Sequence, residues 1–248
     1  MKHLLLSCLL FTSALFAGEI NIAVAANVSY AFDELKAEFA KTHPQTKIQV
    51  TLGSSGKLTA QIKNGAPYGI FMAANMKFPQ SLYEDKIAIT KPAVYAQGAL
   101  AYLSAKQQDF SKGIMLLEDN TIQKIAIANP KTAPYGAAAI QAINNAGIYT
   151  KVEKKFVFAE SISQTVTYAT TAADIGMIAK SSLYSDQMKA YKKGVNWEAV
   201  DPKLYTPIEQ GIVLIRGSEK NPEYKTFYDF ILSQKAKEIF RAYGYIVE

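Results

Sequence analysis

Residues 20–62 read INIAVAANVSYAFDELKAEFAKTHPQTKIQVTLGSSGKLTAQI, and this stretch decides the fold. The apolar run at 20–25 is typical of a strand that is buried on both faces. Residues 30–41 carry apolar side chains at helical spacing. A second strand is expected over 48–52 and a second helix over 55–64. This alternation predicts a parallel or mixed sheet with helices on both faces.

The same alternation continues through the rest of the chain, which has 248 residues and 49% apolar content. Further strands are expected over residues 69–72, 98–103, 125–128, 156–158, 175–178 and 212–215. Further helices are expected over residues 135–145 and 162–172, with two more after Pro222. Two such series predict two lobes of roughly 110 residues each. We expect an α/β fold with lobe 1 at 18–94 and 207–248, lobe 2 at 95–206, and crossovers near 93–97 and 205–210.

The first residues have the pattern of a secretory signal peptide. Lys2 and His3 precede an apolar run, and small residues follow at Ala17-Gly18. The run is too short to span a bilayer. We therefore expect residues 1–17 to be removed on export to the periplasm. Cys8 lies inside this leader, but too little apolar sequence precedes it for a lipoprotein signal, so a lipid anchor is not expected.

The residue inventory excludes several kinds of chemistry. His43, the histidine that remains after leader removal, lies in a polar stretch at the end of a predicted helix. Zinc sites rich in histidine and Cys–His nucleophile pairs therefore cannot be built. Residues 53–56 (GSSG) lack the spacing of a hydrolase nucleophile elbow. The net charge of +6 is scattered along the chain, so no nucleic-acid partner is expected. These features predict a binding protein without cofactor or catalytic activity, and a mild positive field suits a small anion.

Four predicted strands end in small or polar residues that open a helix. These junctions are residues 26–29, 53–56, 129–136 and 160–163. In parallel α/β sheets, ligands sit at such junctions, where helix starts offer free N–H groups and a positive dipole end. The polar side chains there are also ordinary helix N-caps, namely Asn27, Ser29, Ser55 and Ser161. The occurrence of four junctions, flanked by Lys57 and Lys131, indicates one anion site in a cleft between the lobes.

Six stretches in a fixed order carry a resemblance to a known family. They are residues 22–27 (IAVAAN), 54–62 (SSGKLTAQI), 64–67 (NGAP), 128–136 (ANPKTAPYG), 227–230 (FYDF) and 236–245 (AKEIFRAYGY). In these stretches the chain resembles the periplasmic molybdate-binding proteins, which are substrate-binding components of ABC importers. The resemblance implies a two-lobed periplasmic-binding-protein fold of type II topology that closes on a tetrahedral oxyanion.

The resemblance also implies which residues bind the ion. The family positions fall at Asn27 and Ser55, which contribute side chains, and at Tyr135 and Ile162, which contribute main-chain amides. The implied ligand is molybdate or tungstate. The implied partners are an inner-membrane ABC permease and its cytoplasmic ATPase, and a monomer is expected. Many family members carry a tyrosine donor where this chain has Ala179, which leaves affinity and ion preference open.

Other functions compete with this interpretation. Phosphate carries a proton near neutral pH, so its site benefits from a carboxylate acceptor, and Glu160 is the acidic residue nearest to a predicted junction. Sulfate has the same charge and shape as molybdate but is smaller. Amino-acid ligands need a bidentate arginine or carboxylates, and Arg216 and Arg241 are the two arginines present. A secreted hydrolase is the enzymatic alternative.

Overall fold

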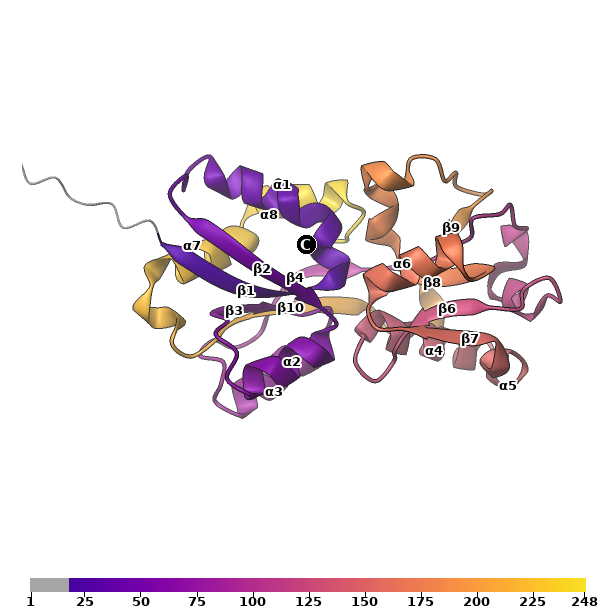
Figure 1. Cartoon of the computed structure of the whole chain (residues 1–248), viewed down its shortest axis with the longest axis horizontal. Coiled ribbons are helices and arrows are strands. Elements are labelled where there is room, and N and C mark those ends of the chain that lie inside the picture. The colour runs from indigo at the N-terminus through magenta and orange to yellow at the C-terminus, as the bar shows by residue number, and fades with distance from the viewer. Residues whose placement is uncertain (1–17) are drawn as a thin grey trace, which may run out of the picture.

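The computed structural model describes residues 18–248, and it contains two five-stranded mixed sheets that lie side by side (Figure 1). The predicted leader at 1–17 and Cys8 lie outside the described residues. In the first sheet the strand order is β2-β1-β3-β10-β4. Its strands are β1 (Glu19–Ala25), β2 (Lys47–Gly53), β3 (Ile70–Met72), β4 (Ala93–Gly98) and β10 (Ile208–Leu214). Strands β1, β2 and β3 are parallel, and β10 is antiparallel to β3 and β4. The carboxyl ends of β1, β2 and β3 therefore meet at one edge.

Helices cover both faces of the first sheet. They are α1 (Ser29–Ala40), α2 (Ser55–Lys63), α3 (Lys77–Glu84), α7 (Pro222–Ile231) and α8 (Gln234–Ala242). Helices α1, α7 and α8 form one apolar core with the sheet, in which the rings of Phe39 and Phe227 lie 5.0 Å apart. Helices α2 and α3 cover the other face through Leu58, Ile62 and Leu82 (Figure 1). Burial on both faces explains why residues 22–25 of β1 are all apolar.

The second sheet has the strand order β7-β6-β8-β5-β9. Its strands are β5 (Leu100–Leu103), β6 (Ile125–Ala128), β7 (Phe156–Ala159), β8 (Ile175–Ala179) and β9 (Trp197–Ala199). Strand β6 runs parallel to β7 and β8, so its carboxyl end and theirs also share an edge. The helices of this half are α4 (Pro134–Asn145), α5 (Tyr149–Val152) and α6 (Ile162–Thr171). Helices α4 and α6 pack on the sheet and form separate apolar cores with it.

Short 3-10 segments connect these elements. They are η1 (Ala26–Val28), η2 (Phe110–Glu118), η3 (Glu153–Lys155), η4 (Lys180–Tyr184), η5 (Asp186–Met188), η6 (Pro202–Leu204) and η7 (Ser218–Lys220). The predicted α/β architecture with two halves is confirmed. The sequence pattern did not predict α3, α5, β9 or η2. The predicted crossover near 93–97 is wrong, because these residues form strand β4 of the first sheet.

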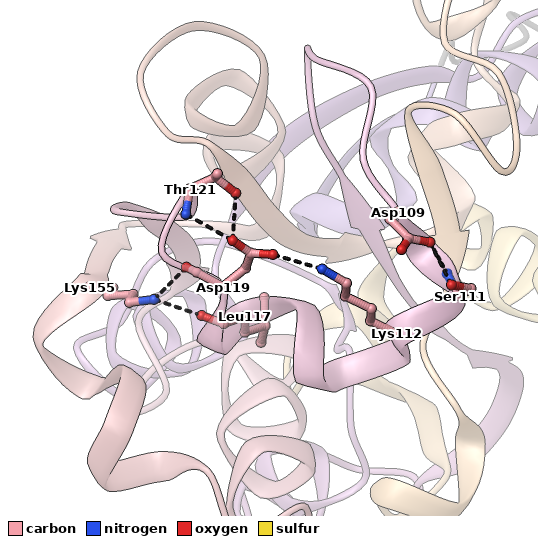
Figure 2. A network of polar contacts seen from close by, with 7 residues as sticks. All are labelled: Asp109, Ser111, Lys112, Leu117, Asp119, Thr121 and Lys155. Atoms are coloured by element: carbon pink, nitrogen blue, oxygen red, sulfur yellow. Dashed lines mark hydrogen bonds and ion pairs between the residues drawn. The ribbon is translucent and has the colours of Figure 1, made fainter.

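Segment η2 is held against its surroundings by polar contacts (Figure 2). The Lys155 ammonium group donates to the carbonyl oxygens of Leu117 and Asp119, each at 3.0 Å. The Asp119 carboxylate accepts hydrogen bonds from Lys112 and Thr121. These bonds, that from Lys112 above all, hold the pKa of Asp119 well below its ordinary value. The network stabilises a surface turn of the second half and involves no junction residue.

The two crossings between the halves lie next to each other. The prediction of one strand over 98–103 is wrong, because β4 ends in the first sheet at Gly98 and β5 begins in the second at Leu100. Strand β4 pairs with β10, and Gly98 lies opposite Ile208. A Cβ atom at Gly98 would collide with the Tyr135 hydroxyl, so glycine allows the second half to approach here. The predicted lobe boundaries, with lobe 1 at 18–94 and 207–248 and lobe 2 at 95–206, stay a prediction.

Candidate functional site

The four predicted site residues line one small cavity between the two halves. Asn27 and Ser55 come from the first half, and Tyr135 and Ile162 come from the second. The remaining lining residues are Ala26, Gly53, Ser54, Ala74, Ala133 and Pro134. The cavity has a volume of about 10 Å³, about that of one water-sized sphere, whereas pockets for drug-sized organic ligands measure about 300–1,000 Å³. The closed site is therefore far too small for an organic ligand.

Three helix starts converge on this cavity. Helices α2, α4 and α6 begin at Ser55, Pro134 and Ile162, directly after the carboxyl ends of the parallel part of each sheet. The backbone N–H groups of Ser55, Tyr135 and Ile162 make no hydrogen bond within residues 18–248. Free N–H groups and the positive ends of helix dipoles attract anions. The backbone at this edge is thus arranged to bind negative charge.

Helix capping explains only one of the four polar side chains at the junctions. The Ser161 hydroxyl accepts a hydrogen bond from the N–H of Gln164 and caps α6. Asn27 and Ser55 make no cap contact, and the Ser29 hydroxyl donates to the carbonyl of Ala26. The capping interpretation is therefore wrong for Asn27, Ser29 and Ser55. The side chains of Asn27 and Ser55 are therefore available for a role other than helix capping.

Two adjacent hydroxyl groups stand at the start of α2. The Ser55 Oγ accepts a hydrogen bond of 2.9 Å from the N–H of Ala74, so its own proton is available to a ligand. The Ser54 Oγ is buried and has no hydrogen-bond partner within residues 18–248. Sequence reasoning missed Ser54 as a site residue, although it stands beside Ser55 at the same junction. Together they offer two neutral hydroxyl donors.

Asn27 belongs to a buried hydrogen-bond network. Its Nδ2 donates to Gln210 Oε1 at 2.8 Å and to the hydroxyl of Tyr245 at 3.0 Å. Gln210 Nε2 donates in turn to the Tyr135 hydroxyl at 3.0 Å, and the Tyr95 hydroxyl donates to Gln210 Oε1 at 2.8 Å. The Tyr135 side chain thus belongs to this network, while its main-chain contact to the ion stays a prediction. Sequence patterns carried no signal for Gln210, which lies in β10 between Glu209 and Gly211.

The hydroxyl groups of this network remain protonated at neutral pH. Burial raises the pKa of Tyr245 to about 12 and raises the pKa values of Tyr95 and Tyr135 well above the ordinary tyrosine value. Their charge therefore stays at zero under physiological conditions, and each hydroxyl can donate or accept a hydrogen bond.

No charged side chain lines the cavity. Glu160 forms an ion pair with Lys57 and borders a neighbouring surface groove instead. Arg216 donates to the carbonyl of Lys86, and Arg241 donates to that of Val247. Among residues 18–248, no cluster of three or more histidine, cysteine or acidic side chains could hold a metal ion. The lining thus presents neutral polar groups and no counter-charge.

The ionisable groups with catalytic potential lie elsewhere. His43 stacks on Phe39 with a ring distance of 4.4 Å and contacts the Thr42 hydroxyl. It does not line the cavity, so the two serines there have no histidine beside them. A Ser-His-Asp arrangement cannot form at this site without rearrangement of the fold.

The two halves contact each other around the cavity. The N–H of Gly56 donates to the carbonyl of Thr132 at 2.8 Å, and the Ser181 hydroxyl donates to the carbonyl of Asn27 at 3.3 Å. A Cβ atom at Gly56 would lie 2.9 Å from the Cα atom of Thr132. The halves are therefore closed over the cavity, and the absence of a side chain at Gly56 permits that closure.

The chain belongs to the bacterial extracellular solute-binding protein family, whose pattern matches residues 20–246. It is 34% identical to the molybdate-binding protein ModA of Azotobacter vinelandii, over 95% of this chain and 93% of that protein. It is 36% identical to ModA of Rhodobacter capsulatus, over 94% of this chain and 90% of that protein. The solved periplasmic molybdate-binding protein of Azotobacter vinelandii matches with a TM-score of 0.84 at 29% identity, covering 92% and 99% of the two chains.

These findings confirm the resemblance to the molybdate-binding proteins and the two-lobed periplasmic-binding-protein fold of type II topology. Within residues 18–248, no helix combines the length and apolar content needed to cross a bilayer.

Proposed function

We propose that this protein captures molybdate, and tungstate with it, in the periplasm and delivers the ion to an ABC importer. The observation that carries the proposal is the small cavity lined by neutral donors from both halves. Asn27, Ser55, Tyr135 and Ile162 are proposed as ligand residues, and the hydroxyl of Ser54 adds a fifth donor. The names of the relatives support molybdate as the ion.

The chemistry of the lining supports a fully ionised dianion. Each oxygen of such an ion only accepts hydrogen bonds, and backbone N–H and hydroxyl groups supply donors without adding a counter-charge. Monoprotonated phosphate needs an acceptor, and Glu160 is held by Lys57 outside the cavity. Sulfate is smaller than molybdate, so a rigid cavity would stretch its hydrogen bonds.

The role in transport follows from the class of protein. We infer export to the periplasm, loss of residues 1–17, and transfer of the ion as a monomer to an inner-membrane permease with its cytoplasmic ATPase. Catalysis and a cofactor have no part in this proposal. The distance of His43 from the cavity lining argues against a hydrolase.

Calorimetric titration of the exported protein with molybdate, tungstate, sulfate and phosphate tests the proposal. Several charge-assisted hydrogen bonds of about 1.5–3 kcal/mol each, reduced by closure and desolvation costs, predict dissociation constants on the order of micromolar or tighter for the first two ions. Sulfate should bind at least a hundredfold more weakly. Equal binding of sulfate would contradict the selectivity, and no heat with any of the four ions would contradict the function.

A further inference from the structure

The amide of Asn27 has its donor engaged inside the protein and its acceptor unpaired. Asn27 is fully buried and lines the cavity, and its Nδ2 donates to Gln210 and Tyr245, which do not line it. The other polar atom of the amide, Oδ1, has no hydrogen-bond partner within residues 18–248. A buried acceptor without a partner costs about 1–3 kcal/mol. An unpaired acceptor beside a bound anion would also repel its oxygens.

Rotation of the Asn27 amide by a half turn would place Nδ2 where Oδ1 now stands. The same rotation would bring Oδ1 against Gln210 Oε1, the atom that now lies 2.8 Å from Asn27 Nδ2. Two acceptors cannot share that contact. The rotation of Asn27 is therefore possible only if the amide of Gln210 rotates as well.

We propose that Gln210 is the positioning residue of the oxyanion site, and that its amide rotates together with that of Asn27 so that Asn27 Nδ2 donates to the bound ion. After the coupled rotation, Gln210 Nε2 donates to Asn27 Oδ1 and fixes the donor end of Asn27 toward the cavity. The proposal rests on the proposed oxyanion function. It explains how an asparagine amide, which must be oriented, can donate to the ion at a position where a serine hydroxyl would rotate freely to do so.

The surrounding tyrosines accommodate both arrangements. The Tyr95 hydroxyl has a second acceptor in the carbonyl of Ala73 at 3.2 Å, so it can donate there and accept from Gln210 Nε2. The Tyr135 hydroxyl, which now accepts from Gln210, can donate to Oε1 instead. The Tyr245 hydroxyl bonds the Asn27 carbonyl at 2.9 Å and can donate to Oδ1. With the ion bound to Asn27 Nδ2, every buried polar atom of the network then has a partner, including Oδ1.

The network also bears on which oxyanion binds. With Oδ1 toward the cavity, Asn27 offers an acceptor, which suits an ion that carries a proton, such as hydrogen phosphate. With Nδ2 toward the cavity, Asn27 offers a donor, which suits a fully ionised dianion. Gln210 lies between Asn27 and Tyr135, so it links this choice to a residue of the opposite half.

A double-mutant cycle separates positioning from a merely structural role. Gln210→Met keeps the length of the side chain and removes its hydrogen bonds, and it should weaken molybdate binding at least tenfold. In an Asn27→Ser background the same change should cost less than threefold, because a serine hydroxyl is a donor in any rotamer. Gln97→Met, the same substitution in the neighbouring strand β4, is the matched control and should change affinity less than twofold. Equal losses in both backgrounds would overturn the proposal.

A second measurement uses the wild-type protein and does not depend on the variants folding. In NMR spectra of protein saturated with molybdate, the Gln210 side-chain NH₂ protons should show stronger nuclear Overhauser contacts to the ring of Tyr95 than to the ring of Tyr135. Stronger contacts to the ring of Tyr135 would overturn the coupled rotation. A wild-type protein that binds none of the four oxyanions would overturn the proposed function, whereas wild-type binding with an unrotated Gln210 overturns this inference alone.

Discussion

The two sides of the cavity differ in the polar groups that they present. The first half presents the side chains of Asn27, Ser54 and Ser55 together with the backbone N–H of Ser55, while the second presents the backbone N–H groups of Tyr135 and Ile162. Side-chain donors depend on residue type and on the contacts that orient them. Backbone donors depend on where a helix begins, so many side chains can stand there. Loss of a side chain should therefore weaken binding on the first side, whereas on the second side only the loss of a backbone N–H should.

The largest effect is expected from removing a backbone donor of the second half. Ile162→Pro deletes the N–H, yet proline is favoured at the first position of a helix, and the extended backbone of Ser161 suits a residue before proline. We expect calorimetry to show about a hundredfold weaker molybdate binding, corresponding to ~3 kcal/mol. Ile162→Ala loses the buried side chain but keeps the N–H, and should cost far less. Equal losses for the two variants would contradict a backbone contribution.

The next effect is expected on the opposite side, at the two serines. Ser55→Ala should weaken molybdate binding tenfold to a hundredfold, since a hydrogen bond to a charged group contributes about 1.5–3 kcal/mol. It should also lower the melting temperature, because the N–H of Ala74 loses its acceptor. Ser54→Ala is the matched variant: its hydroxyl has no protein partner, so affinity should fall while the melting temperature holds. The reverse pattern would assign Ser54 a structural role.

A smaller effect is expected from hindering contact between the two sides. Gly56→Ala suits helix α2 by propensity but places a methyl group against the backbone of Thr132. We expect about tenfold weaker molybdate binding, because closure costs more while each half stays folded. Small-angle scattering should show a smaller decrease in radius of gyration on adding molybdate than in the wild type. An unchanged affinity with an unchanged decrease would show that the halves do not need this contact.

The smallest effect is expected at the ion pair between Lys57 and Glu160, which joins the two halves outside the cavity. Both side chains are exposed, and such pairs contribute about 0.2–1 kcal/mol. Glu160→Gln should therefore change molybdate affinity by less than about fivefold, and salt should remove the difference. Titrations at low and high ionic strength check this. A large loss that persists in high salt would mean that Glu160 reaches the ligand.

Much of the fold could be predicted from the sequence because its signals are local. The apolar residues of β1, the helical spacing in α1 and the proline at the start of α7 each lie within a dozen residues. The four strand-to-helix junctions are also visible locally, and parallel strands bring their carboxyl ends to one edge. The choice of Asn27, Ser55, Tyr135 and Ile162 within those junctions came from the resemblance to the molybdate-binding proteins, and the structure brings all four to one cavity.

Other features were decided only by the tertiary structure. Gln210 contacts Asn27 across 183 positions of sequence and Tyr135 across 75, and no local pattern marks it as a partner of either residue. The apolar run at 98–103 gives no sign that the chain changes sheets at Ala99. The sequence by itself determined the strand-to-helix junctions at 53–56 and 160–163, since backbone conformation there follows from nearby residues. Which end of the Asn27 amide faces the cavity depends on buried partners that only folding brings together.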